Sequence, residues 1–218
     1  MTIRLDNLKK NLNYPELSGN IYCIGRNYRK HVEELANSLP DEPLIFLKSS
    51  ASLKAVAEKS EFNFSDPIHF EAELIVVIGE NLKQNSTVTD ETSICGYSLG
   101  LDLTRRELQN KLKAKGHPWT RAKNFAGSAI IGPFVSSKLK VNELEFEFLL
   151  NGKKRQKANC KDMIFSIVEI LNSLLKLHDL EAGDLIFTGT PEGVGEIKSG
   201  DHYRLHSQKL AIDLEAVL

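Results

Sequence analysis

The stretch from His69 to Gly79 limits what this chain can fold into more than any other. Two acidic residues, Glu71 and Glu73, are two positions apart and are followed directly by the apolar, β-branched run Leu74 to Ile78. Such a run, closed by a glycine, predicts a buried strand. Because the side chains of a strand alternate between its faces, Glu71 and Glu73 are expected to point to the same side.

Two adjacent carboxylates suggest a bound cation. Carboxylates repel one another and are costly to desolvate unless positive charge lies between them. A hard divalent cation, which prefers oxygen ligands, meets this need; the alternative is two solvated glutamates at an exposed strand start. Asp102, in an apolar strand predicted for Cys95 to Leu103, is a candidate third ligand. Its alternative role is the N-cap of the helix predicted from Thr104.

The composition restricts the class of protein. The 218 residues suit a single domain, and 41% hydrophobic and 26% charged residues are ordinary for a soluble globular protein. A formal net charge of −1 gives no electrostatic reason to expect nucleic acid or a membrane as partner. Cys23, Cys95 and Cys160 lack the spacing of a zinc site or a disulfide framework. We therefore expect a soluble, cytoplasmic protein.

A second set of candidates lies on a helix predicted from Arg29 to Leu39 and ended by Pro40. His31 and Glu34 are three residues apart on it and are therefore neighbours on one face. A carboxylate beside an imidazole raises the histidine pKa and orients the ring, so this pair can activate a water as general base. The alternative is an ordinary surface ion pair.

Two loops add further candidates. Lys123 lies in the polar and aromatic loop His117 to Gly127, where it is either a cation for a substrate carboxylate or oxyanion, or a solvated lysine. The stretch Leu180 to Gly195 predicts a turn, a strand and a Gly/Pro loop without the glycine spacing of a nucleotide site. Its backbone and the Thr190 hydroxyl can hold an anion. Many short strands with few helices predict a strand-dominated fold with helices packed outside.

Ordered motifs along nearly the whole chain resemble the fumarylacetoacetate hydrolase family, and most closely its short acylpyruvase and oxaloacetate decarboxylase branch. The resemblance rests on GRNY with the His31 and Glu34 that follow, FLK, the ExE of Glu71 and Glu73, LDLTRRELQ, KGHPWTRAKNF, DMIFSI and DLIFTGTPEGVG. It implies an α+β, strand-dominated fold with a mixed β-sandwich or β-roll core, peripheral helices and a short lid helix. A single catalytic domain over residues 19–218 would follow an N-terminal extension, residues 1–18.

The resemblance also implies a homodimer with one Mg²⁺ or Mn²⁺ in each subunit. Its metal ligands match Glu71, Glu73 and Asp102. Its catalytic dyad on the lid and the lysine of its KxF motif match His31, Glu34 and Lys123. Positions that bind substrate match Arg26, Lys48, Arg106, Gln109 and Thr190. Ser49 follows FLK where members usually carry proline, so we expect a looser loop after Lys48.

The implied activity is hydrolysis of the C–C bond of acylpyruvates, such as acetylpyruvate or fumarylpyruvate, to pyruvate and a carboxylic acid. Oxaloacetate, which shares the 2-oxo acid half, would be decarboxylated in the same site. The alternative within the family is an isomerase or decarboxylase of the 2-hydroxyhepta-2,4-diene-1,7-dioate type in aromatic catabolism. Outside enzymes, the alternative is a metal-dependent binding protein, which would be expected to lack a ligand or the dyad; all five positions are filled here.

Overall fold

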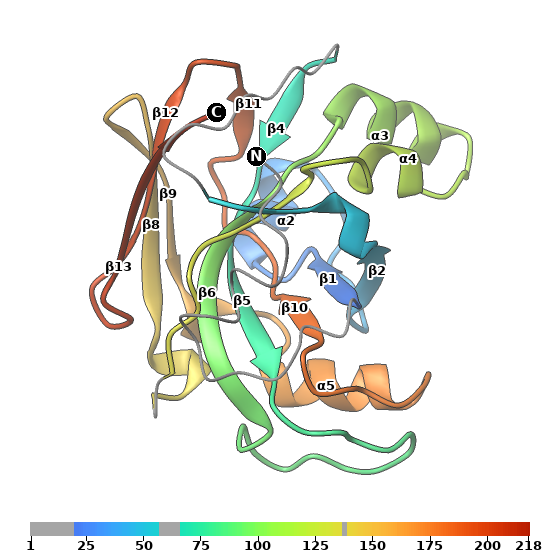
Figure 1. Cartoon of the computed structure of the whole chain (residues 1–218). Helices are drawn as coiled ribbons and strands as arrows, with labels where there is room; N and C mark the ends of the chain where they lie inside the picture. Colours follow the sequence, from blue (N-terminus) through green and yellow to red (C-terminus); the bar gives the residue numbers. More distant parts are fainter. Residues whose placement is uncertain (1–19, 57–65, 137–138) are drawn as a thin grey trace.

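A seven-stranded mixed sheet forms the centre of the described chain, in the order β2-β1-β10-β5-β6-β7-β3 (Figure 1). The computed structural model describes residues 20–56, 66–136 and 139–218, so the expected extension at 1–18 lies outside the described residues. The strands of this sheet are β1 (Ile21–Gly25), β2 (Leu44–Lys48), β3 (Leu53–Ala55), β5 (Ala72–Ile78), β6 (Ile94–Asp102), β7 (Ala129–Ile131) and β10 (Leu185–Phe187).

Strand β5 lies in the middle of this sheet and is buried along its whole length, as the sequence predicts. Leu74, Val76 and Ile78 belong to the larger apolar cluster of the protein, and Ile75 and Val77 to a smaller one. Burial on both faces explains why the run is continuously apolar. Because β5 pairs antiparallel with β10 and with β6, it is a rigid base for the glutamates at its start.

A second, four-stranded sheet, in the order β13-β12-β8-β9, contributes to the larger apolar cluster and lies at one side of the molecule (Figure 1). Asn151 and Gly152 connect β8 to β9 with positive φ angles of 50° and 73°, as a type I′ hairpin turn requires. A short sheet pairs β4 with β11. These strands are β4 (Ile68–Phe70), β8 (Glu145–Leu150), β9 (Lys153–Asn159), β11 (Gly195–Ile197), β12 (His202–Ser207) and β13 (Ile212–Val217).

The α-helices of the described residues lie at the periphery of the strands (Figure 1), which confirms the strand-dominated α+β fold. They are α2 (Arg29–Glu34), α3 (Arg106–Ala114), α4 (Thr120–Lys123) and α5 (Ile167–Leu175), and 3₁₀ turns span Ser50–Ser52, Val141–Glu143 and Cys160–Asp162. Helix α5 begins with a capping box between Ser166 and Glu169. Among the described residues, none of the helices has the length and apolarity needed to cross a membrane.

Helix α2 is shorter than the sequence predicts. It ends at Glu34, well before Leu39, because Ala36 adopts a left-handed backbone conformation with φ of 49°. The amide of Asn37 then donates to the carbonyl oxygen of Val32 at 3.0 Å, and a left-handed residue ends a helix in this way. The short helix still carries His31 and Glu34 as neighbours.

Candidate metal centre and active site

Three buried carboxylates meet at the edge of strands β5 and β6. Glu71 precedes β5, Glu73 lies within it and Asp102 ends β6. The amide of Asp102 donates to the carbonyl oxygen of Glu71 at 2.8 Å, which fixes the register between these segments. One carboxylate oxygen from each residue lies within 4.8 Å of the other two. The N-cap of α3 is Arg105, so Asp102 is not the cap that the sequence left as its alternative.

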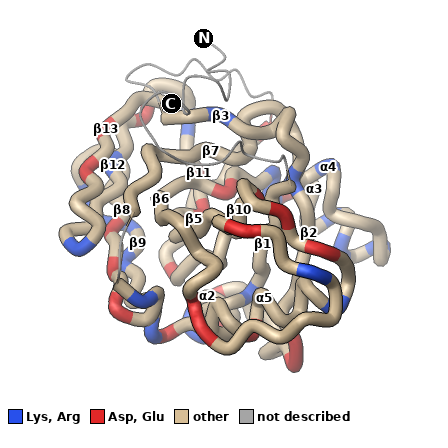
Figure 2. Tube along the Cα trace, turned by 60° about the horizontal axis from the view of Figure 1, so that its bottom comes forward, with Lys and Arg blue, Asp and Glu red and all other residues tan. Residues whose placement is uncertain are grey.

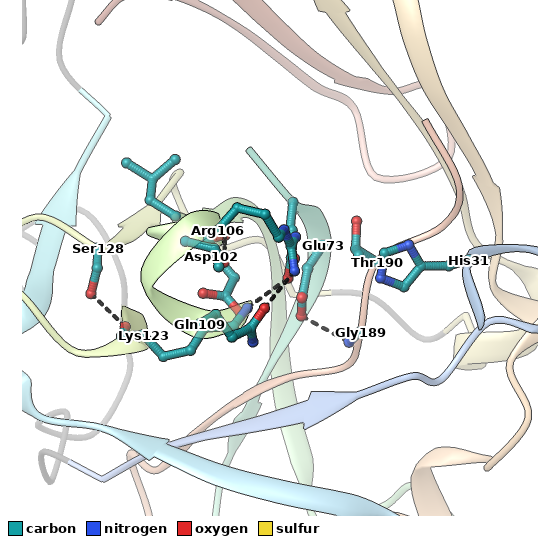
Figure 3. A network of polar contacts seen from close by, with 12 residues as sticks. His31, Glu73, Asp102, Arg106, Gln109, Lys123, Ser128, Gly189 and Thr190 are labelled. Atoms are coloured by element: carbon teal, nitrogen blue, oxygen red, sulfur yellow. Dashed lines mark hydrogen bonds and ion pairs between the residues drawn. The ribbon is translucent and has the colours of Figure 1, made fainter. Parts of the chain in front are cut away.

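Two cationic side chains enter the same space (Figure 3). The Lys123 Nζ atom lies 2.7 Å from a carboxylate oxygen of Glu71 and 2.7 Å from one of Asp102. The Arg106 guanidinium forms an ion pair with the other oxygen of Glu71. Burial alone would raise the pKa of Glu71, but Lys123 and Arg106 hold it well below its usual range. Glu71 is therefore ionised in the folded protein.

Glu73 is in a different electrostatic situation. Its carboxylate accepts a hydrogen bond from the amide of Gly189 at 2.8 Å, and it forms no ion pair with the other described residues. Burial raises the pKa of Glu73 well above its usual range, and the neighbouring charges of Asp102 and Glu71 raise it further. Three converging carboxylates with one left uncompensated are a poor arrangement without a cation.

The carboxylate triad therefore fits a divalent cation. The donor atoms are all carboxylate oxygens, the type that Mg²⁺ and Mn²⁺ prefer. Lys123 places a positive charge between Glu71 and Asp102, and Glu73 is the carboxylate of the three that a divalent cation would compensate. A bound ion would be held by Glu71, Glu73 and Asp102, with Lys123 and Arg106 beside it.

The backbone between the two glutamates is clamped by a side chain that the sequence analysis did not single out. Gln156 of β9 accepts from the Ala72 amide at 2.9 Å and donates to the Thr190 hydroxyl at 2.8 Å. Thr190 in turn donates to the Ala72 carbonyl oxygen at 2.9 Å. The backbone amide and the backbone carbonyl oxygen of Ala72 are thus both hydrogen-bonded. These bonds fix the backbone between Glu71 and Glu73. Nothing local marks Gln156 in the polar strand KKRQKAN; only the long-range pairing reveals it.

His31 lies across Glu73 from Lys123 and beside Thr190 (Figure 3). It is 4% exposed, and its Nδ1 atom lies 3.3 Å from the Glu34 carboxylate. Glu34 is itself held by the amide of Gly193, at 3.0 Å. Burial lowers the pKa of His31, and Glu34 and Glu71 oppose this only in part. The predicted proximity of His31 and Glu34 is confirmed, and the ring is neutral at neutral pH, as a general base requires.

The cavity above the carboxylates brings together most of the expected substrate-binding residues. Arg26, Arg106, Gln109 and Thr190 all line it, together with His31 and Lys123. Arg106 donates to the Gln109 side-chain oxygen at 2.7 Å, so the two side chains form one polar wall. Trp119 and Lys113 complete the wall on the side of α3.

Lys48 lies behind the cavity instead of among its lining residues. Its side chain is fully buried, pairs with Asp102 at 2.8 Å and donates to the carbonyl oxygens of Leu103, Lys123 and Ser128. The looser loop expected after Lys48 stays a prediction; the structure adds that the Ser49 amide donates to the Asn124 side-chain oxygen at 3.1 Å. A proline there has no amide hydrogen to donate, so serine ties this loop to the end of α4.

In the view of Figure 2, basic and acidic residues are interspersed along the described parts of the chain. At the carboxylate triad, buried charges of both signs come together, since Lys48, Arg106 and Lys123 form ion pairs with Glu71 and Asp102. A carboxylate triad that fits a divalent cation, a buried histidine and a lined cavity are together the features of an enzyme active site, here built on a curved, strand-dominated core.

The chain belongs to the fumarylacetoacetate hydrolase family, whose C-terminal domain model matches residues 20–214. It is 36% identical over 197 residues to the oxaloacetate tautomerase YcgM of Escherichia coli, and the match covers 87% of this chain and 88% of the relative. It is 39% identical over 190 residues to the mitochondrial oxaloacetate tautomerase FAHD1 of Bos taurus, covering 85% and 86% of the two chains.

Solved structures share the same fold. The crystal structure of fumarylpyruvate hydrolase from Pseudomonas aeruginosa, in complex with Mn²⁺ and pyruvate, superposes with a TM-score of 0.81 at 31% identity. The match covers 91% of this chain and 88% of that one. The 2-hydroxyhepta-2,4-diene-1,7-dioate isomerase of Mycobacterium marinum superposes with a TM-score of 0.76 at 32% identity, over 94% and 75% of the two chains. Proteins named for different reactions thus share this fold.

Proposed function

We propose that this chain is a divalent-cation-dependent enzyme that interconverts the keto and enol forms of oxaloacetate. The buried triad of Glu71, Glu73 and Asp102 beside a neutral His31 carries the proposal, because enolisation needs both an electron sink and a base. A divalent cation held by the triad would supply Lewis-acid stabilisation of the negative charge that develops on the 2-oxo group. The two oxaloacetate tautomerases at 36% and 39% identity support this choice of reaction.

The side chains of the protein supply the proton transfer. His31, neutral because burial lowers its pKa, takes a proton from C3 of the 2-oxo acid. The 2-oxo oxygen gains a proton from water as the enol forms, and the His31 imidazolium returns its proton to water, so that no net proton is consumed. Glu34, at 3.3 Å, orients the ring and stabilises the imidazolium. Arg106 and Gln109 line the cavity with hydrogen-bond donors for the substrate carboxylate. The reverse transfer uses the same groups.

Hydrolysis of acylpyruvates is the second candidate, supported by the fumarylpyruvate hydrolase that shares the fold. In that reaction His31 takes a proton from a water, which adds to the distal carbonyl carbon, and Lys123 stabilises the oxyanion or returns a proton to C3 after the C–C bond breaks. Decarboxylation of oxaloacetate needs neither an activated water nor removal of a C–H proton. The isomerase of Mycobacterium marinum, which shares the fold, supports isomerisation of a 2-hydroxydienedioate as the alternative reaction. The homodimer stays a prediction from the family resemblance.

The proposed reaction is tested by following the loss of enol oxaloacetate, by its ultraviolet absorbance, with the purified protein and Mg²⁺ or Mn²⁺. We expect a rate well above the uncatalysed one that is lost after complete chelation with EDTA and restored by adding the cation. Acetylpyruvate and fumarylpyruvate are assayed in parallel to rank hydrolysis against tautomerisation. Full activity in the cation-free protein would contradict the proposal.

The role of His31 is tested by His31→Asn. We expect tautomerisation and acylpyruvate hydrolysis to fall by about 100-fold or more, the usual contribution of a general base. Decarboxylation of oxaloacetate by the same variant should fall much less, because that bond breaks without a base. Glu33→Gln, an exposed neighbour on the same helix, is the matched control and should keep all three rates. Equal losses in the three reactions would contradict the assigned role.

A further inference from the structure

The loop from Gly189 to Gly193 contacts both parts of the candidate active site. At its start, the amide of Gly189 donates to the carboxylate of Glu73 at 2.8 Å. At its end, the amide of Gly193 donates to the two carboxylate oxygens of Glu34, at 3.0 and 3.2 Å. One short loop thus holds both a residue of the carboxylate triad and the carboxylate partner of His31.

Strand β9 fixes the position of this loop. The side-chain amide of Gln156 donates to the Thr190 hydroxyl and to the Pro191 carbonyl oxygen, at 2.8 Å each. Gly193 packs directly on the backbone of β9, where a Cβ atom added to it would collide with the carbonyl oxygen of Arg155. Gly193 also has a φ of 95°, which residues with a side chain rarely adopt. In this arrangement, glycine is therefore the residue that fits at position 193.

The orientation of Glu34 depends on this loop. The Glu34 side chain is 33% exposed and lies at the end of the short helix α2. Among the described residues, the His31 ring and the Gly193 amide are the groups that hydrogen-bond its carboxylate. An ion pair of Lys30 with Glu192, at 3.5 Å, also joins the helix to the loop. Both of its side chains are exposed, so this ion pair contributes little.

We propose that Gly193 is a positioning residue for the proton transfer: its backbone amide holds the Glu34 carboxylate in the orientation that aligns the ring of His31. The inference rests on the proposed function, in which His31 is the base. It assigns the alignment of the pair to a backbone amide that lies 159 positions from Glu34 along the chain. A side chain at position 193 would push against Arg155 and move this amide away from Glu34.

Gly193→Ala tests the proposal by comparing reactions that need the base with one that does not. We expect kcat for tautomerisation of oxaloacetate to fall by about tenfold or more, since a small misplacement of a catalytic group is costly. The KM, the affinity for Mg²⁺ and the rate of decarboxylation should each change by less than about twofold. These quantities are retained because Gln156 still anchors the loop between position 193 and Glu73.

Gly200→Ala is the matched control. Gly200 is exposed and has a similar positive φ of 87°, but a Cβ atom added to it would meet none of the described atoms within 4 Å. This variant therefore carries the same kind of backbone strain without a collision, and it should keep the wild-type kcat for tautomerisation. A loss equal to that of Gly193→Ala would mean that general loop strain explains the effect, and it would overturn the proposal.

A double-mutant cycle shows whether Gly193 acts through Glu34. In the Glu34→Ala background there is no carboxylate to position. Adding Gly193→Ala to Glu34→Ala should therefore lower kcat by less than about a further twofold. Losses that multiply would overturn the proposal, because Gly193 would then act on the reaction by another route.

Hydrogen exchange at the Gly193 amide tests the contact itself, without turnover and without a substitution at Gly193. By NMR on protein labelled with heavy-nitrogen glycine, we expect this amide to exchange at least about tenfold more slowly in the wild type than in Glu34→Ala. The Gly200 amide, which donates to the Leu218 carbonyl oxygen at 2.8 Å, should exchange equally in both. Equal exchange at Gly193 would overturn the proposal even if Gly193→Ala does not fold.

The outcomes separate this proposal from the proposed function. If the wild type with its cation catalyses neither tautomerisation nor acylpyruvate hydrolysis, the proposed function fails, and exchange at the Gly193 amide alone decides whether it holds Glu34. If the wild type is active and Gly193→Ala keeps its kcat, the role of Gly193 is overturned and the proposed function stands. The same holds if Gly193→Ala loses decarboxylation to the same extent as tautomerisation.

Discussion

Replacing Glu73 with glutamine is expected to stabilise the cation-free protein and to abolish its response to divalent cations. Glu73 is 2% exposed, and burial together with Asp102 and Glu71 raises its pKa well above the usual range. A carboxyl group whose pKa is higher in the folded state than in the unfolded state stabilises the fold at pH values below the unfolded-state pKa. This stabilisation is lost as the pH rises through the folded-state pKa. At neutral pH without a cation, wild-type Glu73 therefore lowers the free energy of unfolding. Glutamine removes this destabilisation because its side chain carries no charge.

The gain is expected to be about 1–4 kcal/mol, the range seen when a buried charge arrangement is replaced by neutral groups. Urea unfolding in EDTA at pH 5 and at pH 8 measures it, and the difference between variant and wild type should be larger at pH 8. Mg²⁺ at 100 times the wild-type Kd should stabilise the wild type by about 2.7 kcal/mol and Glu73→Gln by no more than about 0.4 kcal/mol.

The control for this experiment is Glu80→Gln, an exposed glutamate just after β5. It should show the wild-type stability and the wild-type response to Mg²⁺. Loss of a partner of a metal ligand already costs about 10–100-fold in affinity, so loss of the Glu73 ligand should cost at least about 100-fold. A Glu73→Gln protein that binds Mg²⁺ as tightly as the wild type would contradict the assignment of the metal centre.

The local sequence predicts the candidate metal centre because two of its carboxylates are spaced by the two-residue period of a strand. Glu71 and Glu73 are two positions apart, at and just before the start of a strand, and the continuous apolar run after them indicates that this strand is buried. Asp102 was left open as ligand or N-cap because one residue can do either. In the structure Arg105 is the N-cap of α3, and the place of Asp102 at the end of β6, which is paired with β5, brings its carboxylate together with those of Glu71 and Glu73, as the ligand role requires.

Contacts between distant segments explain what the sequence does not reveal. Strand β1 pairs in parallel with β10 near the other end of the chain, and no local pattern encodes that neighbour. Gln156 reaches the backbone of Ala72 from β9 in the same way. The early end of α2 depends on the left-handed Ala36, a conformation that the helical pattern of the segment does not announce. Tertiary context thus determines these features.

The role of Lys48 is another feature that depends on contacts between distant segments. The family resemblance places it among substrate-binding residues, while the structure surrounds its ammonium group with Asp102 and the carbonyl oxygens of Leu103 and Ser128. A fully buried lysine with these partners orients a metal ligand from behind. We therefore expect Lys48 to act on the reaction through Asp102, as a positioning residue.

Lys48→Met is accordingly expected to destabilise the protein by about 3–5 kcal/mol, the usual cost of removing one partner of a buried ion pair. Asp102 would lose the cation 2.8 Å from its Oδ1 atom, and the carbonyl oxygens around it would lose their donor. Urea unfolding in EDTA measures the change. Lys153→Met, at an exposed lysine of β9, is the control and should change stability by less than about 0.5 kcal/mol.

A double-mutant cycle with Asp102→Asn identifies the cause. If the loss comes from an uncompensated Asp102 carboxylate, neutralising that carboxylate should recover part of it. Lys48→Met with Asp102→Asn should then be more stable than the sum of the single changes predicts, by at least about 1 kcal/mol. Additive losses would mean that Lys48 acts only through the carbonyl oxygens that it binds, and the carboxylate would be held by Lys123, which lies 2.7 Å from its other oxygen.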